Sequence, residues 1–77
     1  MTPKEKALDL VRSFYEVYPV NGNEYGMEWG MAKQCALIAV DEMIIQNGEL
    51  YLKGIAKEYY AQKNAYLFEV KIEIENL

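Results

Sequence analysis

The sequence predicts an all-α fold: three to four short helices packed around a central apolar helix at about residues 28–46, assembled as a homo-oligomer. One observation is a block from Cys35 to Val40 that is apolar in every direction at ~100° per residue. Another is that the first 18 positions carry apolar residues at spacings of three and four. The last is size, because 77 residues form a marginal core, and this chain has one cysteine and no histidine to supplement it. We expect residues 1–77 to form a single helical domain.

The central helix has more apolar faces than two neighbouring helices can cover. A small-residue stripe and a bulkier stripe leave Ile38 and Ile45 pointing in a third direction. We expect that third face to need another copy of the chain. A buried strand is the alternative, since a short apolar run is ambiguous by period, but the flanking Ala, Lys, Gln and Glu favour a helix. The small stripe consists of Ala32, Cys35, Ala36, Ala39 and Met43, and the bulkier one of Leu37, Val40 and Ile44.

The first helix has a clear start. Thr2 and Glu5 form a capping-box pattern around Pro3, and the amphipathic pattern runs to about Tyr18. Arg12, the sole arginine, lies between acidic residues at i−3 and i+4. A surface ion pair is the simpler interpretation, and an anion contact is the alternative.

Residues 19–30 are predicted to be a loop, with the second helix beginning between Tyr25 and Met31. Tyr25 and Trp29 are four residues apart and share a helical face. They cover the end of the core in one interpretation and stack on a base or ring in the other.

The second helix is predicted to reach about Gln46, with Asn47-Gly48 as its C-terminal cap and a third helix over 49–63. Asp41 is expected to be partly buried and to pair with a cation, for which Arg12, Lys33 and Lys71 are the candidates.

The last segment is ambiguous. Residues 68–75 alternate apolar and charged side chains as a strand does, yet Leu67, Val70, Ile74 and Leu77 also have helical spacing. No second convincing strand is present to pair with it. We predict a helix, with Ile72 as a misfit on its polar face, and keep an intermolecular strand as the alternative.

Composition excludes several functions. Eight basic and twelve acidic residues give a net charge of −4, which argues against binding to nucleic acid. No apolar run approaches the length of a membrane span, so we expect no membrane partner. A lone thiol fits the cytoplasm. Without histidine, and with one serine, the chain is not expected to be an enzyme or to hold a metal or cofactor.

Residues 1–7, 32–42, 68–71 and 74–77 resemble a small helical protein family of tailed phages that infect gut Bacteroidetes-type bacteria. The family is largely without assigned function, so the resemblance implies no catalytic residues. It usually has a polar residue where this chain has Ile72, which supports the helical interpretation of the last segment. Small oligomeric phage proteins include sponges that sequester nucleotide signals of bacterial immunity.

The resemblance therefore implies a first hypothesis: a homo-oligomer in the host cytoplasm that sequesters a cyclic oligonucleotide or an ADP-ribose derivative. In it, Arg12, Lys33 or Lys71 would contact phosphate, and Tyr25 or Trp29 would stack on a base. The alternative is a protein–protein interaction module that inhibits a host protein through its acidic helical surface. A packaging or structural accessory is the third possibility.

Overall fold

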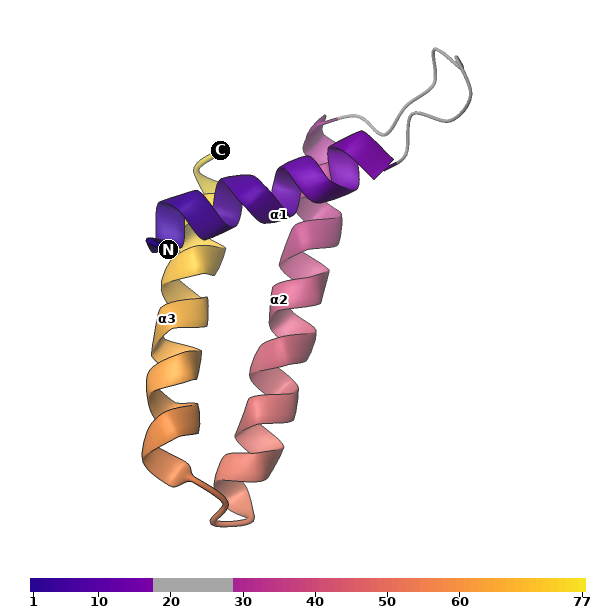
Figure 1. Ribbon diagram of the computed structural model, residues 1–77. Helices are drawn as coiled ribbons and strands as arrows, with labels where there is room; N and C mark the ends of the chain where they lie inside the picture. The colour runs from indigo at the N-terminus through magenta and orange to yellow at the C-terminus, as the bar shows by residue number, and fades with distance from the viewer. Residues whose placement is uncertain (18–28) are drawn as a thin grey trace.

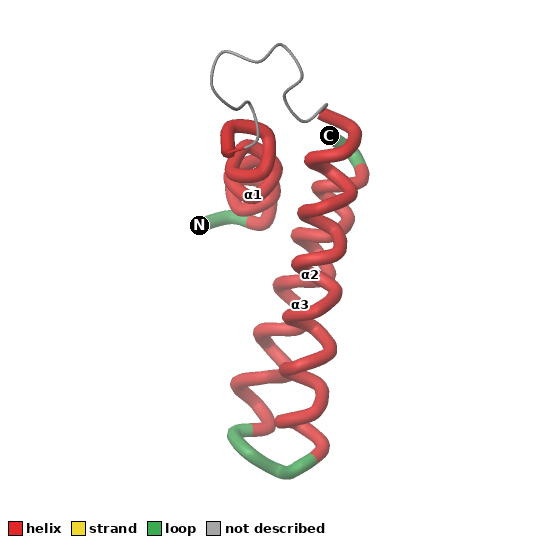
Figure 2. The backbone as a smooth tube through the Cα atoms, turned by 90° about the vertical axis from the view of Figure 1, so that its right-hand side faces the viewer, coloured by secondary structure: helices red, strands yellow, loops and turns green. Residues whose placement is uncertain are grey.

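The computed structural model describes residues 1–17 and 29–77, which form three helices: α1 (Pro3–Val17), α2 (Trp29–Leu52) and α3 (Lys57–Glu75). α2 and α3 form an antiparallel hairpin, and α1 crosses both near the end where α3 finishes (Figure 1). Seen from the side, α1 lies on one face of the hairpin (Figure 2). The described residues span 48 × 20 × 17 Å. The all-α prediction is confirmed for this part of the chain.

The predicted capping box at the start of α1 is present. The Thr2 backbone N–H donates to Glu5 Oε1 at 3.1 Å, and the Glu5 N–H donates to Thr2 Oγ1 at 3.2 Å. These reciprocal bonds satisfy two amides that a helix start leaves without partners. Because the Thr2 bonds favour the charged form, they lower the pKa of the Glu5 carboxyl.

We expect Thr2→Ala to lower the free energy of unfolding by about 1 kcal/mol, the usual loss when a capping hydroxyl is removed. Urea denaturation followed by circular dichroism measures it. Thr2→Ser, which keeps the hydroxyl, is the matched control and should stay close to wild type. If the alanine and serine variants unfold together, the hydroxyl bond contributes nothing.

The core lies where α1 crosses the hairpin. Each helix contributes residues at spacings of three or four, so they line one face of that helix. Three of the core positions are alanines, and two of these belong to the small-residue stripe of the central helix. The buried residues are Ala7 and Val11 of α1, Ala32, Ala36 and Val40 of α2, and Leu67, Val70 and Ile74 of α3.

The predicted cap at Asn47-Gly48 is wrong, because α2 continues to Leu52. The Asn47 side chain donates across the hairpin to Asn64 Oδ1 at 3.0 Å, and Asn64 Nδ2 donates to the Ile44 carbonyl at 3.2 Å. Asn47 therefore holds the two helices in register instead of ending one. Gly48 is accommodated inside the helix, at the usual cost of a glycine there.

Gly54 caps α2 instead. The Ile55 N–H donates to the Leu50 carbonyl at 3.1 Å and the Gly54 N–H to the Tyr51 carbonyl at 3.0 Å, with Gly54 at φ 79°. This is the Schellman pattern, which requires a left-handed residue after the helix. The predicted helix over 49–63 is thus wrong, since the chain turns over between α2 and α3. The sequence does contain a signal for this cap. A glycine at position 54, with the apolar residues Leu50 and Ile55 four before and one after it, is the usual pattern of a Schellman motif.

Ala56, the residue before α3, adopts φ 43°. A left-handed conformation costs an L-residue roughly 1–2 kcal/mol, and glycine avoids that cost while its unfolded chain gains 0.4–1 kcal/mol of freedom. We therefore expect Ala56→Gly to raise the free energy of unfolding by roughly 0.5–1 kcal/mol in urea denaturation. Gly54→Ala, the mirror change two residues earlier, should lower it. A lower free energy of unfolding for Ala56→Gly would show that the left-handed conformation of Ala56 is not strained.

The last segment is helical as predicted, and the strand alternative is wrong. α3 runs to Glu75 and is closed by the Asn76 N–H, which donates to the Ile72 carbonyl at 3.1 Å. Val70 and Ile74 are buried, whereas Phe68 and Ile72 are exposed. In a helix, the alternating pattern places two apolar residues on each of two faces. Ile72 is the predicted misfit, 57% exposed.

Candidate interaction surface

The predicted cation for Asp41 is Lys71. Its Nζ lies 2.9 Å from Asp41 Oδ1, and this ion pair joins α3 to α2. The hydrogen bond to Asp41, that carboxylate's charge and the more distant Glu75 raise the pKa of Lys71. Both side chains remain partly exposed, so the pair is an ordinary partly solvated one. Lys71 is therefore engaged in an ion pair within the fold, and its predicted contact with a phosphate stays a prediction.

Lys33 and Trp29 also serve the fold. Lys33 Nζ donates to the Glu75 carbonyl at 3.5 Å, near the end of α3. Trp29 packs edge-to-face on Tyr15 with ring centroids 5.5 Å apart, and it is half-buried against the core. Trp29 thus covers the end of the core, which was the simpler of the two predicted interpretations.

The remaining predicted ligand residues are Arg12 and Tyr25. Arg12 is exposed on α1, but the side chain of its predicted partner Glu16 lies outside the described residues, so the i,i+4 pair stays a prediction. Tyr25 also lies outside them. None of the predicted ligand residues that the structure describes lines the pocket described next.

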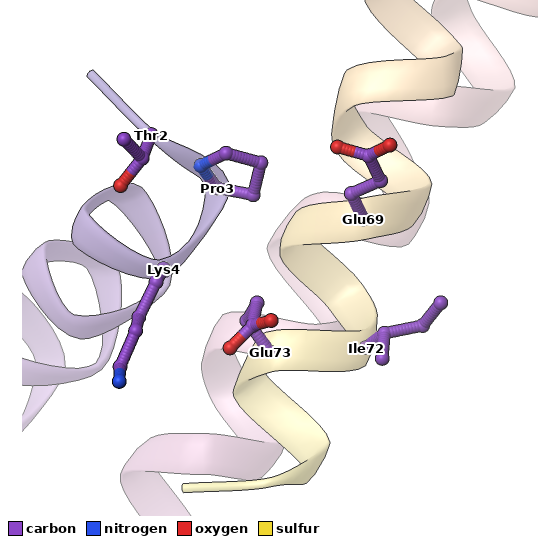
Figure 3. A pocket seen from close by; sticks show the side chains of 6 residues that line it. All are labelled: Thr2, Pro3, Lys4, Glu69, Ile72 and Glu73. Carbon is purple, nitrogen blue, oxygen red and sulfur yellow. The ribbon is translucent and has the colours of Figure 1, made fainter.

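A shallow pocket of about 240 Å³ lies between the start of α1 and the last turns of α3. Glu69 and Glu73 reach over it from α3, and Lys4 extends beside it from α1 (Figure 3). Two carboxylates against one ammonium repel a phosphate. This pocket therefore does not suit the predicted nucleotide signal. Thr2, Pro3, Lys4, Glu69, Ile72 and Glu73 line it.

The outer side of α2 carries a row of large exposed apolar side chains, each seven residues from the next. Positions seven apart drift by only ~20° around a helix, so they form one stripe. Ile38 is 63% exposed and Leu52 is 83% exposed. The stripe consists of Met31, Ile38, Ile45 and Leu52.

Phe68 of α3 lies on the same side of the hairpin as this stripe. Trp29 touches α1, and at 100° per residue Ile38 and Ile45 lie ~160–180° around α2 from it. Tyr66 lies beside the start of α1, since its hydroxyl donates to the carbonyl of Met1, two residues before that helix, at 2.9 Å, and Phe68 lies ~160° around α3 from Tyr66. These residues therefore point away from α1.

We call this surface the outer face and define it by Ile38, Ile45, Phe68 and Ile72 around the Asp41–Lys71 pair. Ile72 lies at its edge, ~120° around α3 from Tyr66, and also lines the pocket beside the start of α1. At a rise of 1.5 Å per residue, each of the four lies within about 6 Å of the ion pair along the hairpin. Figure 2 shows this side of the hairpin without a covering helix among the described residues. The helical spacing of the sequence predicted the part of the outer face formed by Ile38 and Ile45, but not that Phe68 and Ile72 adjoin it.

The closed end of the hairpin, which we call the tip, is aromatic and basic. Lys57 Nζ lies 5.6 Å from the centre of the Tyr51 ring, and Lys63 Nζ lies 5.5 Å from that of Tyr59. Such contacts at exposed sites contribute about 0.5–1 kcal/mol each. The lysines thus cover tyrosine rings as well as facing water.

In residues 1–17 and 29–77, no three His, Cys, Asp or Glu side chains gather closely enough to hold a metal ion. No helix in this part of the chain is long and apolar enough to cross a membrane. Cys35 is a free, half-buried thiol.

Comparisons with protein-family models, curated proteins and solved structures gave no match for this chain. The resemblance to the phage family therefore stays a prediction. The geometry of the chain itself carries the functional argument.

Proposed function

We propose that this chain is a non-enzymatic protein–protein interaction module that works as a homo-oligomer. The observation that carries the proposal is the outer face, with four large apolar residues that are each at least half exposed. Isolated apolar residues are common on protein surfaces, but a contiguous group marks an interaction site. The central helix is thus apolar on its buried side and on its outer side, which agrees with the sequence-based expectation of self-association.

Chain size supports the same proposal. A chain of this length buries a smaller fraction of its surface than a larger domain does, and assembly is one way to bury more. The eight buried core residues of the described chain include three alanines, which contribute little apolar area each. A second copy over the outer face would add larger side chains to that total.

Sequestration of a nucleotide signal, the first hypothesis from the sequence, stays a prediction. Lys71 and Lys33 bond within the fold, and the described pocket is lined by two carboxylates. The interaction module therefore has the better physical support. Its placement in a host cytoplasm also stays a prediction.

Light scattering coupled to size-exclusion chromatography tests the proposal. We expect a mass that is a multiple of 8.9 kDa at micromolar concentration and that falls on dilution. A mass of 8.9 kDa at every concentration up to the millimolar range would overturn self-association.

A further inference from the structure

We propose that the outer face binds the outer face of a second copy, related by a two-fold axis parallel to the hairpin, so that the four hairpin helices form a bundle. This inference rests on the proposed function, because it names the partner and the arrangement of that same surface. In the bundle, α2 of each copy packs on α3 of the other, and the two tips lie at the same end. Each helix then has antiparallel neighbours, the usual arrangement in four-helix bundles.

Among residues 1–17 and 29–77, no helix covers this face, and its size suits an interface. α1 occupies the opposite side of the hairpin, so it does not obstruct the approach (Figure 2). Helices of ~30 Å length and ~10 Å diameter give a two-helix footprint of about 600 Å². A standard stable interface buries about 800 Å² of accessible surface per partner. The accessible surface follows each side chain and exceeds the flat footprint, so a footprint of about 600 Å² is of the right order.

The side chains are placed for such a contact. An axis parallel to the hairpin preserves height, so residues at one level in one copy meet residues at that level in the other. Ile45 of α2 and Phe68 of α3 flank the ion pair within a turn of each other, as Ile38 and Ile72 do. Each isoleucine of α2 therefore faces an apolar side chain of the partner's α3.

Charge selects this axis over the competing one. With the parallel axis, Asp41 of one copy lies at the level of Lys71 of the other, and the two ion pairs combine into a ring of alternating charges. An axis perpendicular to the hairpin that superposes the same faces places α2 on α2 and α3 on α3. It would bring the two Asp41 carboxylates together, and likewise the two Lys71 ammonium groups. Like charges across an interface cost several kcal/mol, whereas alternating ones are favourable.

The position of the tips distinguishes the arrangement from self-association itself. We would place a spin label at Lys53, in the turn between the hairpin helices, by Lys53→Cys in a Cys35→Ser background. Pulsed dipolar spectroscopy of the assembled protein should give a label distance near the 20 Å width of the molecule, well below its 48 Å length. The perpendicular axis would instead place the two labels about 36 Å apart along the hairpin, because Lys53 lies twelve residues past Asp41 at a rise of ~1.5 Å per residue. Label distances of that size or longer, in a protein whose mass is that of a dimer, would overturn the arrangement and leave the proposed function standing. A mass of 8.9 kDa would overturn both.

Charge exchange is the second test. Asp41→Lys would surround the axis with four lysines, and we expect self-association to weaken by roughly 100-fold or more in sedimentation analysis. The double variant Asp41→Lys with Lys71→Asp restores the alternation and should recover to within about tenfold of wild type. Asp9→Lys makes the same change in net charge on α1 and serves as the matched control. Equal association of Asp41→Lys and Asp9→Lys variants, both helical by circular dichroism, would overturn the charge ring.

Discussion

Ile38→Asp should abolish self-association while leaving the fold of the single chain intact. Ile38 is 63% exposed at the middle of the outer face and belongs to no buried cluster. Its loss removes about 1.5–3 kcal/mol of burial from each copy, so a two-fold dimer loses it twice. At 1.4 kcal/mol per factor of ten, the dissociation constant should rise by at least ~100-fold. Sedimentation equilibrium measures this change.

Ile55→Asp is the matched control for that experiment. Ile55 is likewise half-exposed, but it lies in the turn after α2 and not on the outer face. It should self-associate within a few-fold of wild type. Circular dichroism of both variants checks that the helices persist. If the two variants dissociate alike, apolar exposure in general and not the outer face drives assembly.

The two-sided nature of the hairpin helices explains which parts of the fold were predictable. An ordinary surface helix has one apolar stripe, and its period is easily recognised. α1 is of this kind, and both its start at Pro3 and its course to Val17 follow the prediction. α2 and α3 bury one face and expose apolar residues on another, so their periods blur. The alternation over 68–75 resembled a strand for that reason.

The turn between α2 and α3 was mispredicted for a different physical reason. Asn47-Gly48 has the local chemistry of a helix cap. A tertiary hydrogen bond from Asn47 to Asn64, seventeen residues away in the chain, overrides it. The residues near Asn47 in the sequence do not reveal that Asn64 is its partner, because the two meet only when α3 packs against α2. α2 ends further along the chain, at the turn around Gly54. That turn brings α3 back along α2, so that the Asn47 and Asn64 side chains lie opposite each other.

The candidate site was predictable where it depended on a single helix. The expectation that Ile38 and Ile45 form a face of their own needed only the 100° spacing of a helix. The pairing of Asp41 with one of three candidate cations was also expected, but selecting Lys71 required the register of α3 on α2. Phe68 and Ile72 joined the surface only through that register. Lys33, one of the predicted ligand residues, instead makes a hydrogen bond within the fold, to the Glu75 carbonyl.

Ile74→Ala should be the most destabilising of the predicted substitutions. Ile74 is among the largest fully buried side chains and completes the core beneath α1. Truncation of a buried isoleucine costs about 2–5 kcal/mol, because the apolar transfer energy is lost and a cavity remains. At 0.05–0.15 kcal/mol per residue, a 77-residue domain has roughly 4–12 kcal/mol of stability in total. The urea concentration at which half of the protein is unfolded should therefore be much lower for Ile74→Ala than for wild type.

Ile72→Ala gives the complementary control two residues earlier on the same helix. Ile72 is 57% exposed, so its truncation leaves no internal cavity. At concentrations too low for assembly, Ile72→Ala should unfold within about 0.5 kcal/mol of wild type, as exposed substitutions usually do. At concentrations that favour assembly it should weaken association, whereas Ile74→Ala should act through the fold at both. Equal destabilisation by the two variants at low concentration would show that α3 does not divide its apolar residues between core and outer face.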